Sequence, residues 1–234
     1  MAKRTTQKKN PNLHLLWPTP FLVKKFGQYQ KVNKELLELF YKHRSENESK
    51  KSSMYASKDN IYALYGEQEC VKKLVKFIMD GVFEVASEVN APYWGEPKSI
   101  DIEITGLWFQ MSNDHCFHET HVHGNCAWSG VYYVQAGDCD TSKKSHKPGE
   151  IPNGVTRFYG PHLDISAGGH GEFGNMYLQD THFDSYPESG KLVVFPPHIK
   201  HMPFPYNGEE DRVIVSFHAQ IHNPDGFSFG YSFS

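Results

Sequence analysis

The segment His121–Val134 reads HVHGNCAWSGVYYV, and the predicted architecture is built outward from it. It begins with His121 and His123, which are separated by one apolar residue. In an extended chain alternate side chains face the same side, so both imidazoles are expected to point in one direction. The segment ends in the run Val131–Val134, whose β-branched and aromatic residues predict a strand. Two histidines beside a rigid strand predict a site for a divalent metal.

A third histidine lies far downstream, behind another predicted strand. The strand Leu192–Phe195 follows a turn and ends in two prolines, and His201 comes shortly after them. A histidine at the mouth of a barrel strand is well placed to complete a metal site. His121, His123 and His201 are therefore the candidate metal ligands, and they would also be the catalytic residues.

An arginine opens the last predicted strand, Arg212–Gln220, eleven residues after the third histidine. Arg212, Ile214 and Ser216 share one strand face. If that face is interior, the arginine is buried, which is costly unless a carboxylate meets it. Because no nearby acidic residue is an obvious partner, the carboxylate of a ligand is expected there. Tyr133 could present its hydroxyl to the same group.

The composition is that of a soluble globular protein of one large domain. The 234 residues are 38% hydrophobic and 22% charged, and the net charge of −3 gives no reason to expect nucleic acid or a membrane as a partner. No apolar run approaches the roughly 18 residues of a membrane span, and the basic N-terminus lacks the apolar stretch of a signal peptide. The four cysteines form no CxxC pair, which predicts free thiols in a reducing cytoplasm.

Two helices are expected before a run of strands. Apolar residues recur at helical spacing over Val32–His43 and from Glu67 to Asn90, with Pro92 as the predicted stop. A polar loop is predicted over Ser45–Asp59. The expected strands are an edge strand or arm within Leu13–Val23, then Ile100–Thr105, Leu107–Met111 with a bulge at Gly106, Val131–Val134, Val155–Tyr159, Leu192–Phe195 and Arg212–Gln220.

Strands without βαβ alternation favour an antiparallel double-sheet barrel, mainly β, with helices packed outside it. The predicted division is a flexible tail, 1–12, and one domain, 13–234. Within that domain an arm and the helices occupy 13–98, the barrel core 99–222, and a C-terminal extension 223–234. Two long polar loops, Gly137–Gly154 and Pro161–Asp184, are candidate lids that would carry substrate specificity.

The pattern resembles the 2-oxoglutarate- and iron(II)-dependent oxygenase superfamily. More narrowly, it is similar to a small family of oxygenases from marine bacteria and phages whose centre reads close to HxH…SGVYYV. The resemblance covers nearly the whole chain, in the segments WPTPF, GLWFQM, HETHVHGNCAWSGVYYVQ, GKLVVFPPHIKH and RVIVSFH. It implies a double-stranded β-helix, or jelly roll, with iron(II) as cofactor and 2-oxoglutarate as co-substrate.

The resemblance also implies roles for individual residues. His121 and His201 would hold the iron, while Arg212, Tyr133 and Ser216 would bind 2-oxoglutarate. The departure is His123, because the superfamily places Asp or Glu there to complete a facial triad. The implied activity is that of a dioxygenase, an oxidoreductase that hydroxylates a small molecule or peptide and releases succinate and CO2. The sequence does not identify that substrate or the oligomeric state.

Two other classes of protein remain open. A cupin-type three-histidine metalloenzyme would want Glu or Gln a few residues after HxH, where this chain has Asn125–Trp128. A zinc-binding barrel that is not an oxygenase would also accept three histidines. The expected carboxylate site at Arg212 and Tyr133 argues against both classes, because neither class needs one. Glu119 and Cys126 are alternative ligands, His118 is a possible neighbour of the site, and His218 is interpreted as a packing residue.

Overall fold

The computed structural model describes residues 19–50, 52–58, 60–94, 100–141, 150–160 and 182–222. The helices are α1 (Tyr29–Asn47), α2 (Ile61–Tyr65) and α3 (Glu69–Trp94). Both long helices were predicted, and α1 extends beyond its predicted range at each end. Their buried residues follow the apolar stripe read from the sequence, for example Leu36 in α1 and Leu74 in α3.

Two helical predictions are wrong in detail. Helix α3 does not stop before Pro92 but includes it and continues to Trp94. A proline lacks the N–H that would donate to the carbonyl four residues earlier, and because the helix ends two residues later at Trp94, this loss interrupts no longer helix beyond it. The short α2 was not predicted. It begins at Asn60, whose side chain accepts a hydrogen bond from the N–H of Tyr62 at 2.9 Å, and its Ile61 is fully buried.

The strands form two antiparallel sheets, as expected for the jelly-roll fold class. The larger has the order β1-β7-β4-β9-β3-β2 and the smaller the order β6-β5-β8. Their bounds are β1 Leu22–Lys25, β2 Met54–Ala56, β3 Asp101–Ser112, β4 Trp128–Gln135, β5 Thr156–Tyr159, β6 His182–Ser185, β7 Lys191–Phe195, β8 His201–Pro203 and β9 Arg212–His222. The prediction of a loop over Ser45–Asp59 is wrong in part, because its first residues belong to α1 and it contains strand β2. The end of the loop predicted over Pro161–Asp184 belongs to strand β6.

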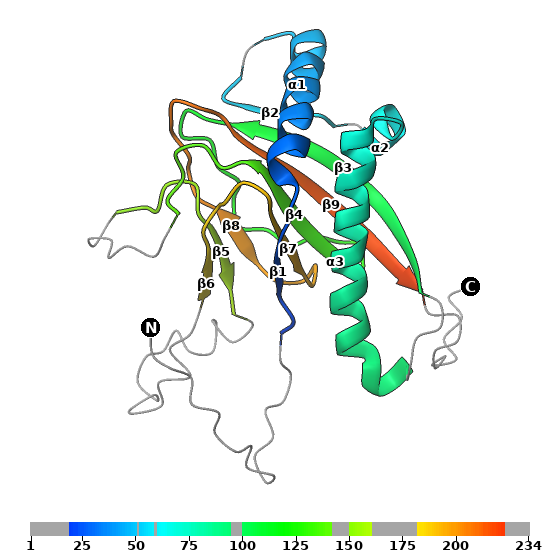
Figure 1. Cartoon of the computed structure of the whole chain (residues 1–234). Helices are drawn as coiled ribbons and strands as arrows, with labels where there is room; N and C mark the ends of the chain where they lie inside the picture. Colours follow the sequence, from blue (N-terminus) through cyan, green and yellow to red (C-terminus); the bar gives the residue numbers. More distant parts are fainter. Residues whose placement is uncertain are drawn as a thin grey trace, which may run out of the picture.

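The helices cover one face of the larger sheet (Figure 1), where α1 contacts β4 and α3 contacts β7, β3 and β1. The main hydrophobic core lies between them. A smaller apolar cluster lies on the opposite face, between the two sheets, and contains Tyr133, Phe158, Val193, Phe195, Ile199 and Ile214. Because this second cluster is small, it leaves a cavity between the sheets.

Strand β9 alternates between the two sides of the larger sheet as predicted. Val213, Val215 and Phe217 belong to the helical core, whereas Arg212 and its face line the cavity. The predicted bulge is also present, since the register of β3 against β9 shifts between Ile104 and Gly106.

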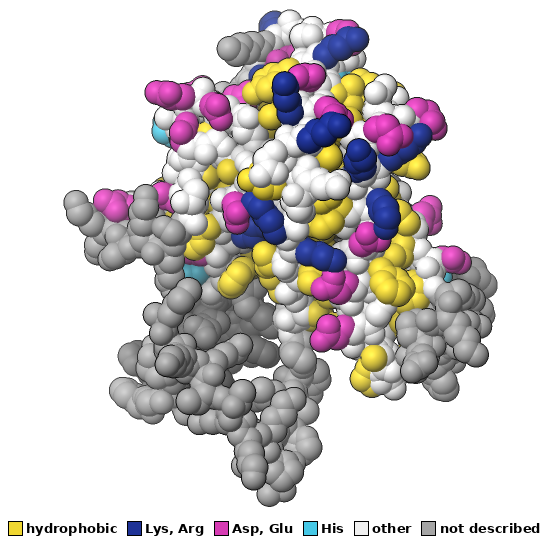
Figure 2. Space-filling model, viewed as in Figure 1, with side chains coloured by type: hydrophobic (Ala, Val, Ile, Leu, Met, Phe, Trp, Pro, Cys, Tyr) yellow, Lys and Arg dark blue, Asp and Glu magenta, His cyan; other side chains and the backbone are white. Residues whose placement is uncertain are grey.

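Other expectations have mixed outcomes. All four cysteines are free of disulfides. No described helix is both long and apolar enough to cross a membrane. Figure 2 shows acidic and basic side chains interspersed on the helical face, without a large patch of one sign. The segments 1–12, 142–149, 161–181 and 223–234 lie outside the described residues, so the tail, most of the candidate lids and the C-terminal extension are not tested.

Candidate metal and co-substrate site

Three histidines converge at one end of the cavity. His121, His123 and His201 each offer one ligand nitrogen, and these atoms lie within 4.8 Å of one another. Among the described residues this is the group of histidines, cysteines and acids compact enough to hold an ion. Cys126 and the carboxylate of Glu119 are outside it, although both had been considered as ligands.

Backbone hydrogen bonds fix the three histidines relative to one another. His121 and His201 form an antiparallel bridge in which each N–H donates to the carbonyl of the other at 3.0 Å. The N–H of His123 donates to the carbonyl of Pro197 at 2.9 Å. His201 therefore lies on β8 of the smaller sheet, directly opposite the His-x-His segment.

The ring hydrogen bonds select one tautomer for two of these histidines. The Nδ1 of His121 lies 2.7 Å from the carbonyl oxygen of Glu119, and the Nδ1 of His201 lies 3.0 Å from that of Ile199. Because a carbonyl oxygen only accepts, each Nδ1 carries the proton, and each neutral ring keeps its Nε2 lone pair free. This is the arrangement that ring nitrogens of metal-binding histidines usually adopt.

Burial keeps two of the rings neutral. Burial, with a smaller contribution from neighbouring histidines, lowers the pKa of His123 to about 3 and that of His201 to about 4. A neutral imidazole need not lose a proton before it binds a metal. These directions therefore favour coordination at neutral pH.

The cavity next to the histidines has a volume of about 240 Å³. It is lined from the larger sheet by Trp108, Gln110, Gly130, Val131, Tyr133, Phe195, Arg212, Ile214 and Ser216, and from the opposite side by His118, the three histidines, Thr156, Phe158 and Pro203. Pockets for drug-sized ligands span roughly 300–1,000 Å³. The volume is therefore suited to a small organic acid.

Arg212 is a buried cation that also lines this cavity. Only 3% of it is exposed, its Nε donates to the Ser112 hydroxyl at 3.2 Å, and its Nη1 donates to the Gly154 carbonyl at 2.9 Å. No ion pair joins it to any carboxylate among the described residues. Since an uncompensated buried charge is costly, this geometry favours an anion that the described residues do not supply.

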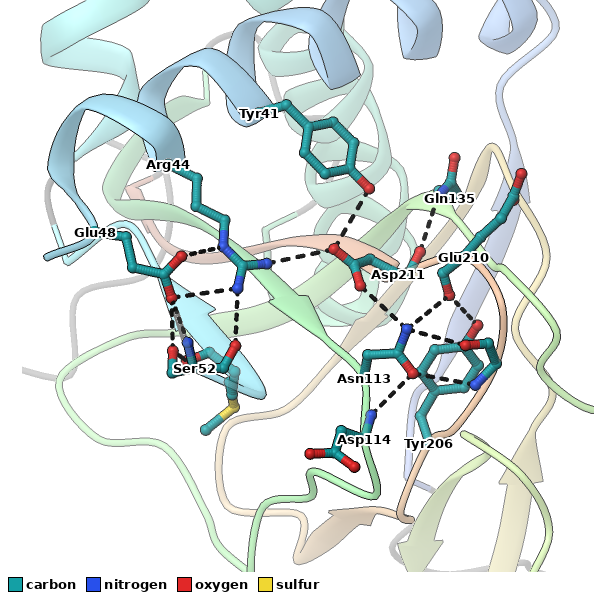
Figure 3. A network of polar contacts seen from close by, with 12 residues as sticks. Tyr41, Arg44, Glu48, Ser52, Asn113, Asp114, Gln135, Tyr206, Glu210 and Asp211 are labelled. Carbon is teal, nitrogen blue, oxygen red and sulfur yellow. Dashed lines mark hydrogen bonds and ion pairs between the residues drawn. The ribbon is translucent and has the colours of Figure 1, made fainter. Parts of the chain in front are cut away.

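The acid nearest in sequence, Asp211, is held elsewhere (Figure 3). Its carboxylate accepts from Arg44 at 3.3 Å, from Asn113 at 3.2 Å and from Tyr41 at 3.5 Å. Its carbonyl accepts from Gln135 at 2.9 Å. This network fixes the start of β9 and keeps the carboxylate adjacent to Arg212 away from the cavity.

Hydroxyls and one histidine surround the same region of the cavity. The Tyr133 hydroxyl lies 3.3 Å from that of Thr156, and burial raises the pKa of Tyr133, so its phenol stays protonated. The Nε2 of His118 is buried without a hydrogen-bond partner among the described residues. Buried polar atoms are rarely left unpaired, so this nitrogen also indicates a missing ligand.

Sequence reasoning missed a fourth histidine at the site. The Nε2 of His218 lies 3.1 Å from the Nδ1 of His123. The alternation of β9 continues from Ser216 to His218, so the period-two pattern could have placed it on the cavity face. The prediction that His218 is a packing residue therefore misses this contact.

The comparisons with known proteins agree with this geometry. Residues 106–218, which include all candidate site residues, match the model of a family described as "Putative 2OG-Fe(II) oxygenase". That description contains the cofactor and co-substrate predicted from the sequence. No curated protein matches the chain.

Solved structures of similar fold include a hydroxylase and two proteins whose descriptions name 2-oxoglutarate (alpha-ketoglutarate). A prolyl-4-hydroxylase from Pseudomonas putida is 14% identical, with a TM-score of 0.50, and the match covers 86% of this chain and 92% of that chain. HygX from Streptomyces hygroscopicus, solved with nickel and 2-oxoglutarate, is 12% identical, with a TM-score of 0.51 and coverages of 90% and 84%.

A third is SnoN, a non-heme alpha-ketoglutarate-dependent epimerase from nogalamycin biosynthesis. It is 13% identical, with a TM-score of 0.54, and the match covers 92% of this chain and 87% of that chain. At these identities the likeness shows the fold, which is the predicted jelly roll. Together with the match of residues 106–218 to the "Putative 2OG-Fe(II) oxygenase" model, it agrees with the resemblance to 2-oxoglutarate- and iron(II)-dependent oxygenases found in the sequence.

Proposed function

We propose that the protein is a 2-oxoglutarate- and iron(II)-dependent dioxygenase that hydroxylates a small molecule or peptide and releases succinate and CO2. The observation that carries this proposal is the pairing of two features in one cavity. Three histidines with free ring nitrogens converge at one end, and a buried arginine that pairs with no carboxylate of the described residues lines the same space.

His121, His123 and His201 would hold the iron. Three neutral nitrogens on neighbouring segments can occupy three positions of an octahedral ion and leave the rest open. Bound there with 2-oxoglutarate, iron(II) supplies the activation of O2 that couples decarboxylation of the co-substrate to hydroxylation of a substrate C–H bond. The protein contributes the placement of the ligands and a cavity that excludes water.

Arg212 would bind the far carboxylate of 2-oxoglutarate. A guanidinium presents donors in a planar fork that matches a carboxylate, and burial strengthens the contact. Tyr133, kept protonated by burial, would donate its O–H to the same group. Ser216 lines the cavity from β9, and the Nε2 of His118, which has no partner among the described residues, would supply one further donor when it carries the ring proton.

We also propose that residues 13–234 form one oxygenase domain. The six-stranded sheet supports this, because it combines β1 and β2 from the N-terminal part with strands from the family-matched segment. The free thiols suit a reducing compartment such as the cytoplasm.

The test combines metal analysis with co-substrate binding. Protein purified without oxygen should bind one iron(II) and then 2-oxoglutarate, and a substrate screen should reveal stimulated release of succinate. Iron binding without 2-oxoglutarate binding would favour a cupin-type enzyme. Retention of zinc with no response to 2-oxoglutarate would favour a zinc protein.

A further inference from the structure

We propose that His218 is a positioning residue that sets the tautomer and orientation of His123 through the hydrogen bond between their rings. This inference rests on the proposed function of the three-histidine site. It assigns to His218 an effect on metal affinity that is exerted through His123 rather than by contact with the ion.

The hydrogen bond connects strand β9 to the His-x-His segment before β4. His218 lies near the end of β9, on the cavity face that also carries Arg212 and Ser216, and its Nε2 is 3.1 Å from Nδ1 of His123. His123 lies on the segment before β4. The rings of Trp108 and His218 pack edge to face, with centroids 4.9 Å apart, and this contact restricts the imidazole.

The same nitrogen is anchored in all three candidate ligands. His121 and His201 use Nδ1 to donate to backbone carbonyls, whereas Nδ1 of His123 faces a side chain. For His123 to present Nε2 to a metal, its Nδ1 must carry the proton and donate it to Nε2 of His218. His218 then keeps its own proton on Nδ1, and both rings remain neutral.

Local packing makes room for this pair. Gly106 is the residue paired with His218 across β3 and β9, next to the bulge. A Cβ at Gly106 would lie 3.7 Å from Nδ1 of His218 and 3.3 Å from the Trp108 ring. The glycine therefore lets Trp108 and His218 pack closely at the position where His218 must meet His123.

His218 is not a fourth ligand in this arrangement. The compact group of ligand atoms contains His121, His123 and His201 alone among the described residues. The nitrogen of His218 that faces the site is already used by His123. An effect of His218 on metal binding should therefore disappear when His123 is removed, which distinguishes positioning from coordination.

The experiment measures iron(II) affinity without oxygen, by competition with a chelator, in the wild type and three variants. Outer hydrogen-bond partners of metal ligands contribute about 10- to 100-fold to affinity. We expect His218→Ala to weaken binding by that factor. We expect His218→Gln to restore most of it, because its Oε1 lies where Nε2 was and accepts from His123. The matched control His218→Asn is one methylene shorter and should not restore it.

A double-mutant cycle completes the test. In a His123→Ala background, His218→Ala should change iron affinity by less than about twofold, because the group through which it acts is gone. Wild-type iron affinity in folded His218→Ala protein, or equal rescue by Asn and Gln, would overturn this inference but leave the proposed function standing. A wild-type protein that binds no divalent iron would overturn the proposed function and this inference with it.

Discussion

Arg212→Met should abolish most of the affinity for 2-oxoglutarate while leaving the metal site intact. Methionine keeps a long apolar side chain and removes the charge from a residue that is 3% exposed. Removing one partner of a buried charge pair costs about 3–5 kcal/mol. Since about 1.4 kcal/mol corresponds to a factor of ten, the dissociation constant should rise by roughly two to three and a half orders of magnitude.

The ligand-free protein should respond differently to the same change. Losing the guanidinium leaves the Ser112 hydroxyl and the Gly154 carbonyl without their donor, which is unfavourable. It also removes a buried cation that has no described carboxylate partner, which is favourable. These opposing effects predict that the free energy of unfolding without ligand changes by less than about 2 kcal/mol.

Calorimetry on anaerobic, iron-loaded protein measures the affinity, and denaturant unfolding with and without co-substrate checks it. At 2-oxoglutarate equal to 100 times the wild-type dissociation constant, binding should stabilise the wild type by about 2.7 kcal/mol. A 100-fold weaker variant should gain only about 0.4 kcal/mol. Arg157→Met is the matched control, because Arg157 is engaged by Asp184 at 2.7 Å. Unchanged affinity in Arg212→Met would refute the assignment of the carboxylate site.

Four further predictions address neighbouring groups. His118→Ala should weaken 2-oxoglutarate binding by about 1.5–3 kcal/mol in calorimetry and leave iron binding unchanged; equal affinity would remove His118 from the site. Gly130→Ala should lower the free energy of unfolding by about 1–3 kcal/mol in urea, because the new Cβ would lie 2.3 Å from the Phe217 ring. Burial lowers the pKa of His123 and His201 in the folded protein to about 3 and about 4. The metal-free protein should therefore have its full stability above pH 6.5, which is about the pKa of a histidine in the unfolded chain. Its stability should fall towards pH 4 by up to about 1.4 kcal/mol per pH unit for each histidine, and a flat urea-unfolding profile would contradict this. His123→Asp should bind iron(II) more tightly and 2-oxoglutarate less tightly in titrations, and loss of iron would argue against His123 as a ligand.

The alternation of residues along strands could be read from the sequence. It predicted that Arg212, Ile214 and Ser216 would share the cavity face and that Tyr133 would point the same way. Both follow from the period of two, which depends only on backbone geometry. The identity of the fold needed more, because short strands of similar composition fit several all-β barrels, and the family resemblance selected the jelly roll.

Proximity across the barrel could not be read in the same way. The bridge between His121 and His201 joins residues 80 positions apart, and its existence depends on how the two sheets meet. Strand β2 and helix α2 are too short to show a period. The engagement of Asp211 by Arg44 spans 167 residues, so the sequence could not show where that acid is held.

The neutral residue at position 123 changes the electrostatics of the whole site. If a carboxylate stood there, the charges would be −1 for the carboxylate, +2 for iron(II), −2 for the 2-oxoglutarate dianion and +1 for Arg212. With two neutral histidines these charges sum to zero. With His123 the sum is +1. A site with excess positive charge binds an anionic co-substrate more strongly and a dication more weakly. Three neutral rings would then have to hold the metal by the direction of their lone pairs, so orientation would matter more than for a charged ligand. That requirement explains why each of the three Nδ1 atoms has a hydrogen-bond partner within 3.1 Å.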